Sequence, residues 1–201
     1  MLIRSRIVFA AQLSLALLLL PSAAQAVEPA IGAMQPYGFQ RGKEQEVTLG
    51  GARLGDAQEL LFYSPGITVA ELKPENDGSV KVKLNIAPDC RLGIHAVRLR
   101  SATGVSNLMT FMIGNFAEVK EVEPNTEFTL PQAVPMNSTV SGVVTNEDVD
   151  NYVVEVKKGE RITAELEGLR LGRTFFDPYL AILNASRFEL ARSDADLPDW
   201  A

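Results

Sequence analysis

The sequence is short of the residues from which most catalytic and redox sites are built. It contains one cysteine, Cys90, and one histidine, His95, among 201 residues. A lone cysteine cannot form an intramolecular disulfide, and any triad of the usual kind would need His95, which lies in a strand-like segment. Gly-x-Ser-x-Gly, His-Glu-x-x-His, Gly-x-Gly-x-x-Gly and P-loop patterns are all absent. We therefore predict that the protein is not an enzyme and that Cys90 is a small buried apolar residue.

Long apolar runs are confined to the N-terminus. A short basic segment, 4–6, precedes the almost wholly apolar run 7–20, a proline then breaks the helix, and Ala24-Gln25-Ala26 offers the small residues that signal peptidase reads. The apolar run is short for a membrane span, and no cysteine follows it that could carry a lipid anchor. We expect a signal peptide over 1–26 and a secreted, periplasmic or cell-surface protein without a transmembrane segment after cleavage. The alternative is an uncleaved N-terminal anchor.

Positive charge is also scarce, with 19 Lys and Arg against 25 Asp and Glu and a net charge of -6. Loss of Arg4 and Arg6 with the signal peptide would change that charge from -6 to -8. Proteins bind nucleic acids and anionic lipids largely through Lys and Arg, so this balance excludes nucleic acid as a favoured partner. It is compatible with a solvated exterior and with cation binding.

Short strands separated by turn residues dominate the first half. The clearest runs from Val80 to Ile86, where apolar residues alternate with Lys81, Lys83 and Asn85, so that one face packs on a core and the other meets water. Further strands are expected around 46–49, 60–63, 67–72, 94–100 and 108–113. Seven or so strands without a sustained helical period predict an all-β protein, with a β-sandwich over 27–114.

The second half is expected to form another, incomplete β-sandwich over 129–201, after a polar linker at 115–128. Its strand-like segments are 138–144, 152–156, 161–166, 179–183 and 188–191. The pair 152–156 and 161–166 is predicted to form a hairpin about Gly159, which is placed to take a positive φ. About five strands are few for a closed sandwich.

Framework motifs occur in order along the first half. They are Ile31-Gly-Ala-Met-Gln-Pro36, Arg41-Gly42 before Glu46-Val-Thr-Leu-Gly-Gly-Ala-Arg-Leu54, Val80-Lys-Val-Lys-Leu84, Gly93-Ile-His-Ala-Val97, and Thr103-Gly104-Val-Ser106. In these the segment 30–114 resembles the IPT/TIG class of immunoglobulin-like domains. The resemblance implies a non-catalytic spacer or interaction module.

A second set of motifs begins at Glu121. It comprises Glu121-Val-Glu-Pro-Asn125, Asp148-Val-Asp-Asn-Tyr-Val-Val-Glu-Val156, Lys158-Gly-Glu160, Asp177-Pro-Tyr-Leu-Ala-Ile-Leu183 and Ala191-Arg-Ser-Asp194. With these the chain from 121 onward resembles the bacterial pre-peptidase C-terminal (PPC) domain, a jelly-roll module of secreted proteases and surface proteins. The final strands of that family are missing, so the resemblance implies a truncated domain. The order of the two modules is similar to that in large exported proteins of planctomycete-like bacteria.

Oxygen-bearing side chains gather in two places in this second half. Glu121, Glu123 and Asn125 alternate along an extended lead-in, and Glu147, Asp148 and Asp150 cluster in a turn before Tyr152. If the lead-in folds beside that turn, the oxygens of both groups converge. Hard oxygen ligands in a flexible loop suit Ca²⁺. The alternative is that these acids only solvate a linker and a turn.

The PPC resemblance adds a ligand set to this reading. Some collagen-binding members of the family place calcium with a Glu-x-Glu-x-Asn lead-in and an acidic turn, and the matching residues here are Glu121, Glu123, Asn125 and Asp150, with Glu147 or Asp148 assisting. Thr126 stands where the family has an acidic residue, which removes one carboxylate from the set.

Three functions remain open from the sequence. The first is an exported, non-catalytic binding or spacer module that forms the N-terminal part of a larger protein, with the downstream domains and extracellular polysaccharide or protein as its partners. The second is the accessory region of a secreted hydrolase (peptidase) whose catalytic domain is not in this chain. The third is a carbohydrate- or matrix-binding adhesin.

The N-terminal pattern gives a direct test. Sequencing of exported protein should begin at Val27, because signal peptidase reads the small residues at 24 and 26. Exported protein that still carries Met1 would instead indicate an uncleaved anchor.

Overall fold

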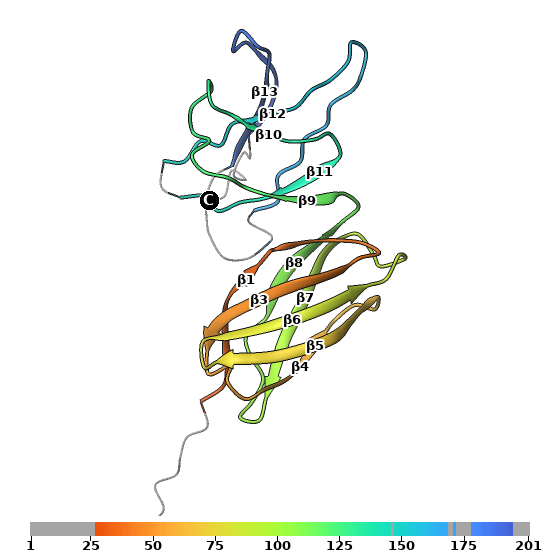
Figure 1. Ribbon diagram of the computed structural model, residues 1–201, viewed down its shortest axis with the longest axis vertical. Helices are drawn as coiled ribbons and strands as arrows, with labels where there is room; N and C mark the ends of the chain where they lie inside the picture. The colour runs from red at the N-terminus through yellow and green to blue at the C-terminus, as the bar shows by residue number, and fades with distance from the viewer. Residues whose placement is uncertain (1–26, 146, 169–170, 172–177, 195–201) are drawn as a thin grey trace, which may run out of the picture.

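The computed structural model describes residues 27–145, 147–168, 171 and 178–194, and the predicted signal peptide lies outside them. Among these residues, every secondary-structure element longer than one residue is a strand, which confirms the predicted all-β fold class. The strands form two groups that follow one another along the long axis of the molecule (Figure 1). Within the described ranges, no helix has the length and apolar character needed to cross a membrane.

The first group is a sandwich of two four-stranded sheets. Its strands are β1 (Ala30–Gln35), β2 (Gly38–Gln40), β3 (Glu44–Ala52), β4 (Ala57–Phe62), β5 (Ile67–Asn76), β6 (Ser79–Ile86), β7 (Gly93–Ser101) and β8 (Met109–Gly114). One sheet has the order β1-β3-β6-β5 and the other β2-β8-β7-β4. All neighbours are antiparallel except β2 and β8, which run parallel. This is the two-sheet strand arrangement of an immunoglobulin-like sandwich.

Alternating apolar residues fill the space between the sheets. On β6 the side chains of Val80, Val82, Leu84 and Ile86 are buried, as the period of two predicts. Phe111 on β8 lies at the centre and is fully buried. Its ring meets Phe39 edge-on at a centroid distance of 5.3 Å and stacks on His95 at 5.7 Å. Aromatic pairs of this geometry add to the free energy gained by burial alone.

The single cysteine and the single histidine of the chain are both buried in this sandwich. Cys90 is a buried free thiol, and burial is the main reason that its pKa is raised. His95 is 2% exposed, and its Nε2 lies 2.7 Å from the backbone oxygen of Arg91. These positions give both side chains a packing role.

In its described residues, the second group contains six short strands in three two-stranded sheets. They are β9 (Ala117–Lys120), β10 (Gln132–Ala133), β11 (Ser138–Ser141), β12 (Tyr152–Val153), β13 (Tyr179–Leu183) and β14 (Glu189–Asp194). β9 pairs with β11 and β10 with β12, both in parallel, whereas β13 and β14 form an antiparallel hairpin. The segment 115–128, expected as a linker, therefore contains a strand that belongs to the second group.

The predicted hairpin between 152–156 and 161–166 is wrong. Only Tyr152 and Val153 form a strand, which pairs with β10, and 161–166 contains no strand. Alternation along a segment predicts that it is extended but does not select its partner, and here the partner lies about twenty residues earlier in the chain. The turn itself is confirmed, since Gly159 has a φ of 94° and the Glu160 amide donates to the Lys157 carbonyl.

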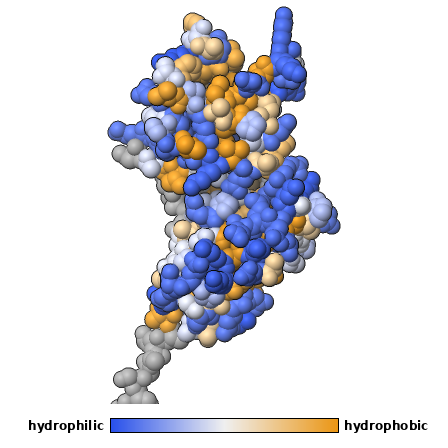
Figure 2. Space-filling model, viewed as in Figure 1, coloured by the Kyte–Doolittle hydropathy of each residue, from blue (hydrophilic) through white to orange (hydrophobic). Residues whose placement is uncertain are grey.

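The two groups differ in how much apolar surface they bury. All members of the buried apolar core lie between Ile31 and Ile113, and the second group leaves Leu130, Phe188 and Leu190 about two-thirds exposed, at 66%, 69% and 66%. Figure 2 shows apolar surface gathered over the upper, second group on that face of the molecule. Among the described residues beyond β9, only Asn125 is fully buried.

The turn before β5 provides a test of the first sandwich. Gly66 has a φ of 96°, and a Cβ there would come within 3.0 Å of the backbone and side chain of Cys90. We expect Gly66→Ala to lower the free energy of unfolding by more than the roughly 1–2 kcal/mol of a left-handed alanine. Gly93→Ala is the matched control, because Gly93 has a φ of 103° but only the flexible Arg91 side chain nearby. Urea unfolding should show the larger loss for Gly66→Ala, and equal losses would contradict the close contact with Cys90.

Candidate metal centre

Three carboxylates meet beside the end of β9. Glu121, Glu123 and Asp150 each offer an oxygen, and these oxygens all lie within 4.8 Å of one another. Glu121 and Glu123 come from the lead-in after β9, and Asp150 comes from the turn before β12. The structure therefore brings together the two acidic segments that lie about thirty residues apart in the sequence.

Asn151 joins the two segments. Its backbone amide donates to the Asn125 carbonyl at 3.0 Å, and its side-chain Nδ2 donates to the Thr126 carbonyl at 2.9 Å. Gln132 holds the lead-in from its other side, since its Oε1 accepts from the Val122 amide at 2.9 Å and its Nε2 donates to the Lys120 carbonyl at 3.0 Å. Backbone groups that a strand ladder would otherwise satisfy are thus satisfied by amide side chains.

Both oxygens of Glu121 accept hydrogen bonds. The Tyr152 hydroxyl donates to Oε1 at 2.5 Å, and the Val143 amide donates to Oε2 at 2.8 Å. Burial is the first cause of a raised Tyr152 pKa, and the hydrogen bond to Glu121 is the second, so the phenol keeps its proton and remains a donor. These bonds hold the Glu121 carboxylate in one orientation, facing its two acidic neighbours.

Asn125 lies beneath the carboxylates and is 1% exposed. Its backbone amide donates to Glu123 Oε2 at 3.0 Å, and its Nδ2 lies 3.5 Å from Glu121 Oε1. Its Oδ1 is buried without a hydrogen-bond partner among the described residues, and the same is true of Asp150 Oδ1. A buried oxygen without a donor costs about 1–3 kcal/mol, and here two such oxygens belong to residues of one cluster.

Asp150 is the most strongly perturbed acid of the cluster. Its pKa is raised from 3.8 to about 6, first by burial and then by the negative charges of Glu121, Asp148 and Glu123. Like charges at this separation disfavour simultaneous ionisation unless a cation neutralises them. The group is therefore an oxygen-rich, negatively charged site. Its carboxylate and amide oxygens are the kinds of ligand that Ca²⁺ binds in proteins.

Glu147 and Asp148 lie outside the three-carboxylate group. Asp148 Oδ2 accepts from the amide and the hydroxyl of Thr145, at 2.9 and 3.0 Å, and these bonds lower its pKa. Glu147 is exposed and has a φ of 58°. The turn thus points Asp150 toward the lead-in while Asp148 stabilises the turn itself, and assistance from either residue remains a prediction.

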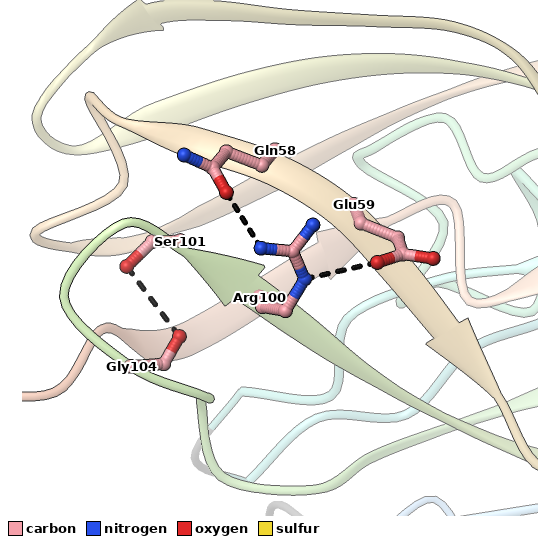
Figure 3. A network of polar contacts seen from close by, with 5 residues as sticks. All are labelled: Gln58, Glu59, Arg100, Ser101 and Gly104. Atoms are coloured by element: carbon pink, nitrogen blue, oxygen red, sulfur yellow. Dashed lines mark hydrogen bonds and ion pairs between the residues drawn. The ribbon is translucent and has the colours of Figure 1, made fainter.

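Two arginines on β7 of the first sandwich make hydrogen bonds to neighbouring groups. Arg100 on β7 donates from Nε to Glu59 at 2.9 Å and from a terminal nitrogen to Gln58 at 2.6 Å, both on the neighbouring strand β4 (Figure 3). Arg98 donates to the Tyr63 hydroxyl and to the Ser106 carbonyl. These arginines are satisfied within the sandwich and are not arranged around a common anion position.

Sequence reasoning did not anticipate the contributions of Asn151, Tyr152 and Gln132. Asn151 and Tyr152 adjoin Asp150 in the sequence, so their proximity to the cluster could have been inferred. Gln132 carries no comparable signal, because its role depends on the parallel pairing of β10 with β12.

No protein-family model matches the sequence, and no curated protein matches it. Among solved structures, the filamin domain of Lin-41 is similar, with 13% sequence identity and a TM-score of 0.33 over 43% of this chain and 92% of that one.

The perturbed Asp150 leads to a prediction about pH. Its folded-state pKa lies above its ordinary value, so the folded protein binds the proton more tightly, and without a cation stability falls as pH rises from about 4 to about 6. Asp150→Asn should remove that part of the decline. Thermal melts in chelator at several pH values provide the measurement, and an identical decline in both proteins would show that Asp150 does not titrate in this range.

Proposed function

We propose that this chain is an exported, non-catalytic binding or spacer module within a larger secreted or cell-surface protein, and that one Ca²⁺ ion orders its second unit. The proposed ligands are Glu121, Glu123, Asn125 and Asp150. In this proposal the first unit is an IPT/TIG-like sandwich and the second is PPC-like, and its partners are the downstream domains and extracellular polysaccharide or protein.

The observation that carries the cation proposal is the burial of Asn125. Proteins rarely bury an amide oxygen without a donor, and when they do the missing partner is commonly water or an ion. Asn125 adjoins the three carboxylates, since its backbone amide donates to Glu123 Oε2 at 3.0 Å and its Nδ2 lies 3.5 Å from Glu121 Oε1. A cation would neutralise the mutual repulsion of the acids and give the amide oxygen its partner.

The spacer role follows from the chemistry that the chain offers. Cys90 and His95 are buried in the core of the first sandwich, and Arg98 and Arg100 are bonded to their neighbours. The first sandwich therefore provides a well-packed structural domain that could hold neighbouring parts of the protein apart. Cation binding at the lead-in would then order the second unit relative to the strand that enters it.

Calcium should therefore raise the melting temperature. An ion that binds only the folded state stabilises it by about 2.7 kcal/mol at about a hundredfold excess over its dissociation constant. Thermal melts of the full-length protein in calcium and in chelator measure this shift. Asp150→Ala and Asn125→Ala should each abolish most of it, because each removes a proposed ligand.

The matched control is Glu127→Gln. Glu127 is an exposed acid of the same lead-in, outside the three-carboxylate group, so its variant should retain the full calcium shift. If calcium shifts Asp150→Ala as much as the wild type, the ion binds elsewhere. If no protein responds to calcium, the acids solvate the surface and only the spacer proposal remains.

A further inference from the structure

The chain that leaves the first sandwich is hydrogen-bonded to it at two successive residues, Gly114 and Asn115. The Arg41 amide donates to the carbonyl of Gly114 at 2.9 Å, and the Gln40 side chain donates to the carbonyl of Asn115 at 3.1 Å. Gly114 ends β8, and β9 begins at Ala117. The chain therefore leaves the first sandwich with two of its carbonyls engaged, unlike a free linker.

Gln45 on β3 links the two units directly. Its Oε1 accepts from the backbone amide of Gln40, and its Nε2 lies 3.5 Å from Glu118 Oε2 on β9. One side-chain amide thus contacts the first sandwich through its acceptor and the second unit through its donor. The Ser141 hydroxyl of β11 donates to the same Glu118 carboxylate.

The two units also approach closely at this point. A Cβ on Gly38 of β2 would lie 3.5 Å from Ser141 Oγ and 3.9 Å from the Thr139 methyl group, both on β11. β11 is the parallel partner of β9, with Ser141 opposite Lys120 and Thr139 opposite Glu118. The sheet formed by β9 and β11 therefore packs against the end of the first sandwich beside β2 and β8 (Figure 1).

Glu118 is the half-buried acid of this contact. Burial raises its pKa, while the hydrogen bonds from Ser141 and Gln45 lower it in part. The groups that face it from β3 and β11 are neutral. Glu44 and Glu46 flank Gln45 in sequence but alternate to the opposite face of β3, and Lys120, two residues after Glu118 on β9, is exposed.

We propose that Gln45, Glu118 and Ser141 form a pH-sensitive joint that holds the second unit on the first when Glu118 is protonated and loosens when Glu118 ionises. The joint is independent of the cation cluster, which begins at Glu121, and would operate in chelator.

The direction of the pH dependence follows from linkage. The docked arrangement takes Glu118 partly out of water, so it binds the Glu118 proton more tightly than an arrangement in which the units separate. Docking is therefore most favoured below the ordinary glutamate pKa and weakens as the pH rises through the raised value. The two groups that donate hydrogen bonds to the carboxylate, from Gln45 and Ser141, are neutral.

The test is a distance measurement between the units. Spin labels at Ala70→Cys on β5 and Thr129→Cys in the second unit occupy exposed positions, and Cys90 is buried and need not be replaced. In chelator, the wild-type distance distribution should be narrow at about pH 4 and broaden toward about pH 8. Glu118→Gln keeps a hydrogen-bonding side chain without the charge, so its distribution should stay narrow throughout.

Gln45→Glu provides the opposite change. It places a second carboxylate 3.5 Å from Glu118 Oε2, so the distribution should broaden strongly at about pH 8 and recover on acidification. Glu44→Gln, an exposed change on the same strand, should behave as the wild type. A wild-type distribution that does not change with pH, or a Gln45→Glu distribution as narrow as the wild type at about pH 8, would overturn the proposal. If Gln45→Glu fails to fold, the comparison of wild type with Glu118→Gln decides alone.

Discussion

Burial of the alternating apolar faces between the two sheets of the first sandwich is the constraint on which the rest of the structure depends. Phe111 is at its centre, contacted by Phe39 and His95, and the other inward residues of β8, Met109 and Ile113, are buried with it. Because β8 is held on both sides by β2 and β7, its direction at Gly114 is set by the core. β9 begins three residues later, so the core also sets where the second unit starts.

The second unit is organised by polar contacts to a much greater extent. Asn151 and Gln132 bind the backbone of the lead-in, and Glu121 accepts from Tyr152 and Val143. Among the described residues of this unit beyond β9, the one fully buried side chain is that of Asn125. A unit with little apolar burial gains little from the hydrophobic effect, so the net charge of its polar cluster has a proportionally larger influence on its stability.

Two acidic groups at the two ends of β9 follow different physical rules. Glu118 stands among neutral groups and is perturbed by burial, whereas Asp150 is perturbed by burial and also by the charges of other acids. Protonation removes the cost of burying the Glu118 charge. Either protonation or a bound cation removes the repulsion between Asp150 and its acidic neighbours. The proposed joint and the proposed cation site are consequently separable, although only two residues lie between Glu118 and Glu121.

The sequence by itself determined the fold class and most of the first sandwich. The alternation from Val80 to Ile86 was sufficient because a strand with one buried face has a period of two, whatever its partner. The sequence also predicted structural positions for Cys90 and His95, because His95 lies in a strand-like segment and Cys90 lies just before it. The hairpin predicted at 152–166 was wrong because the same pattern carries no information on which strand pairs with which.

Only the tertiary structure decided which oxygens meet. The sequence offered six candidates, and folding brought Glu121, Glu123 and Asp150 together over buried Asn125 while it turned Asp148 toward Thr145. That selection depends on Asn151 bonding the lead-in to the turn, a contact across about twenty-five residues. The contact of Gln45 with Glu118 spans 73 residues, and no local pattern predicts it. Local periodicity reports which face of a segment is buried, whereas convergence of distant side chains is set by how the packed strands are joined.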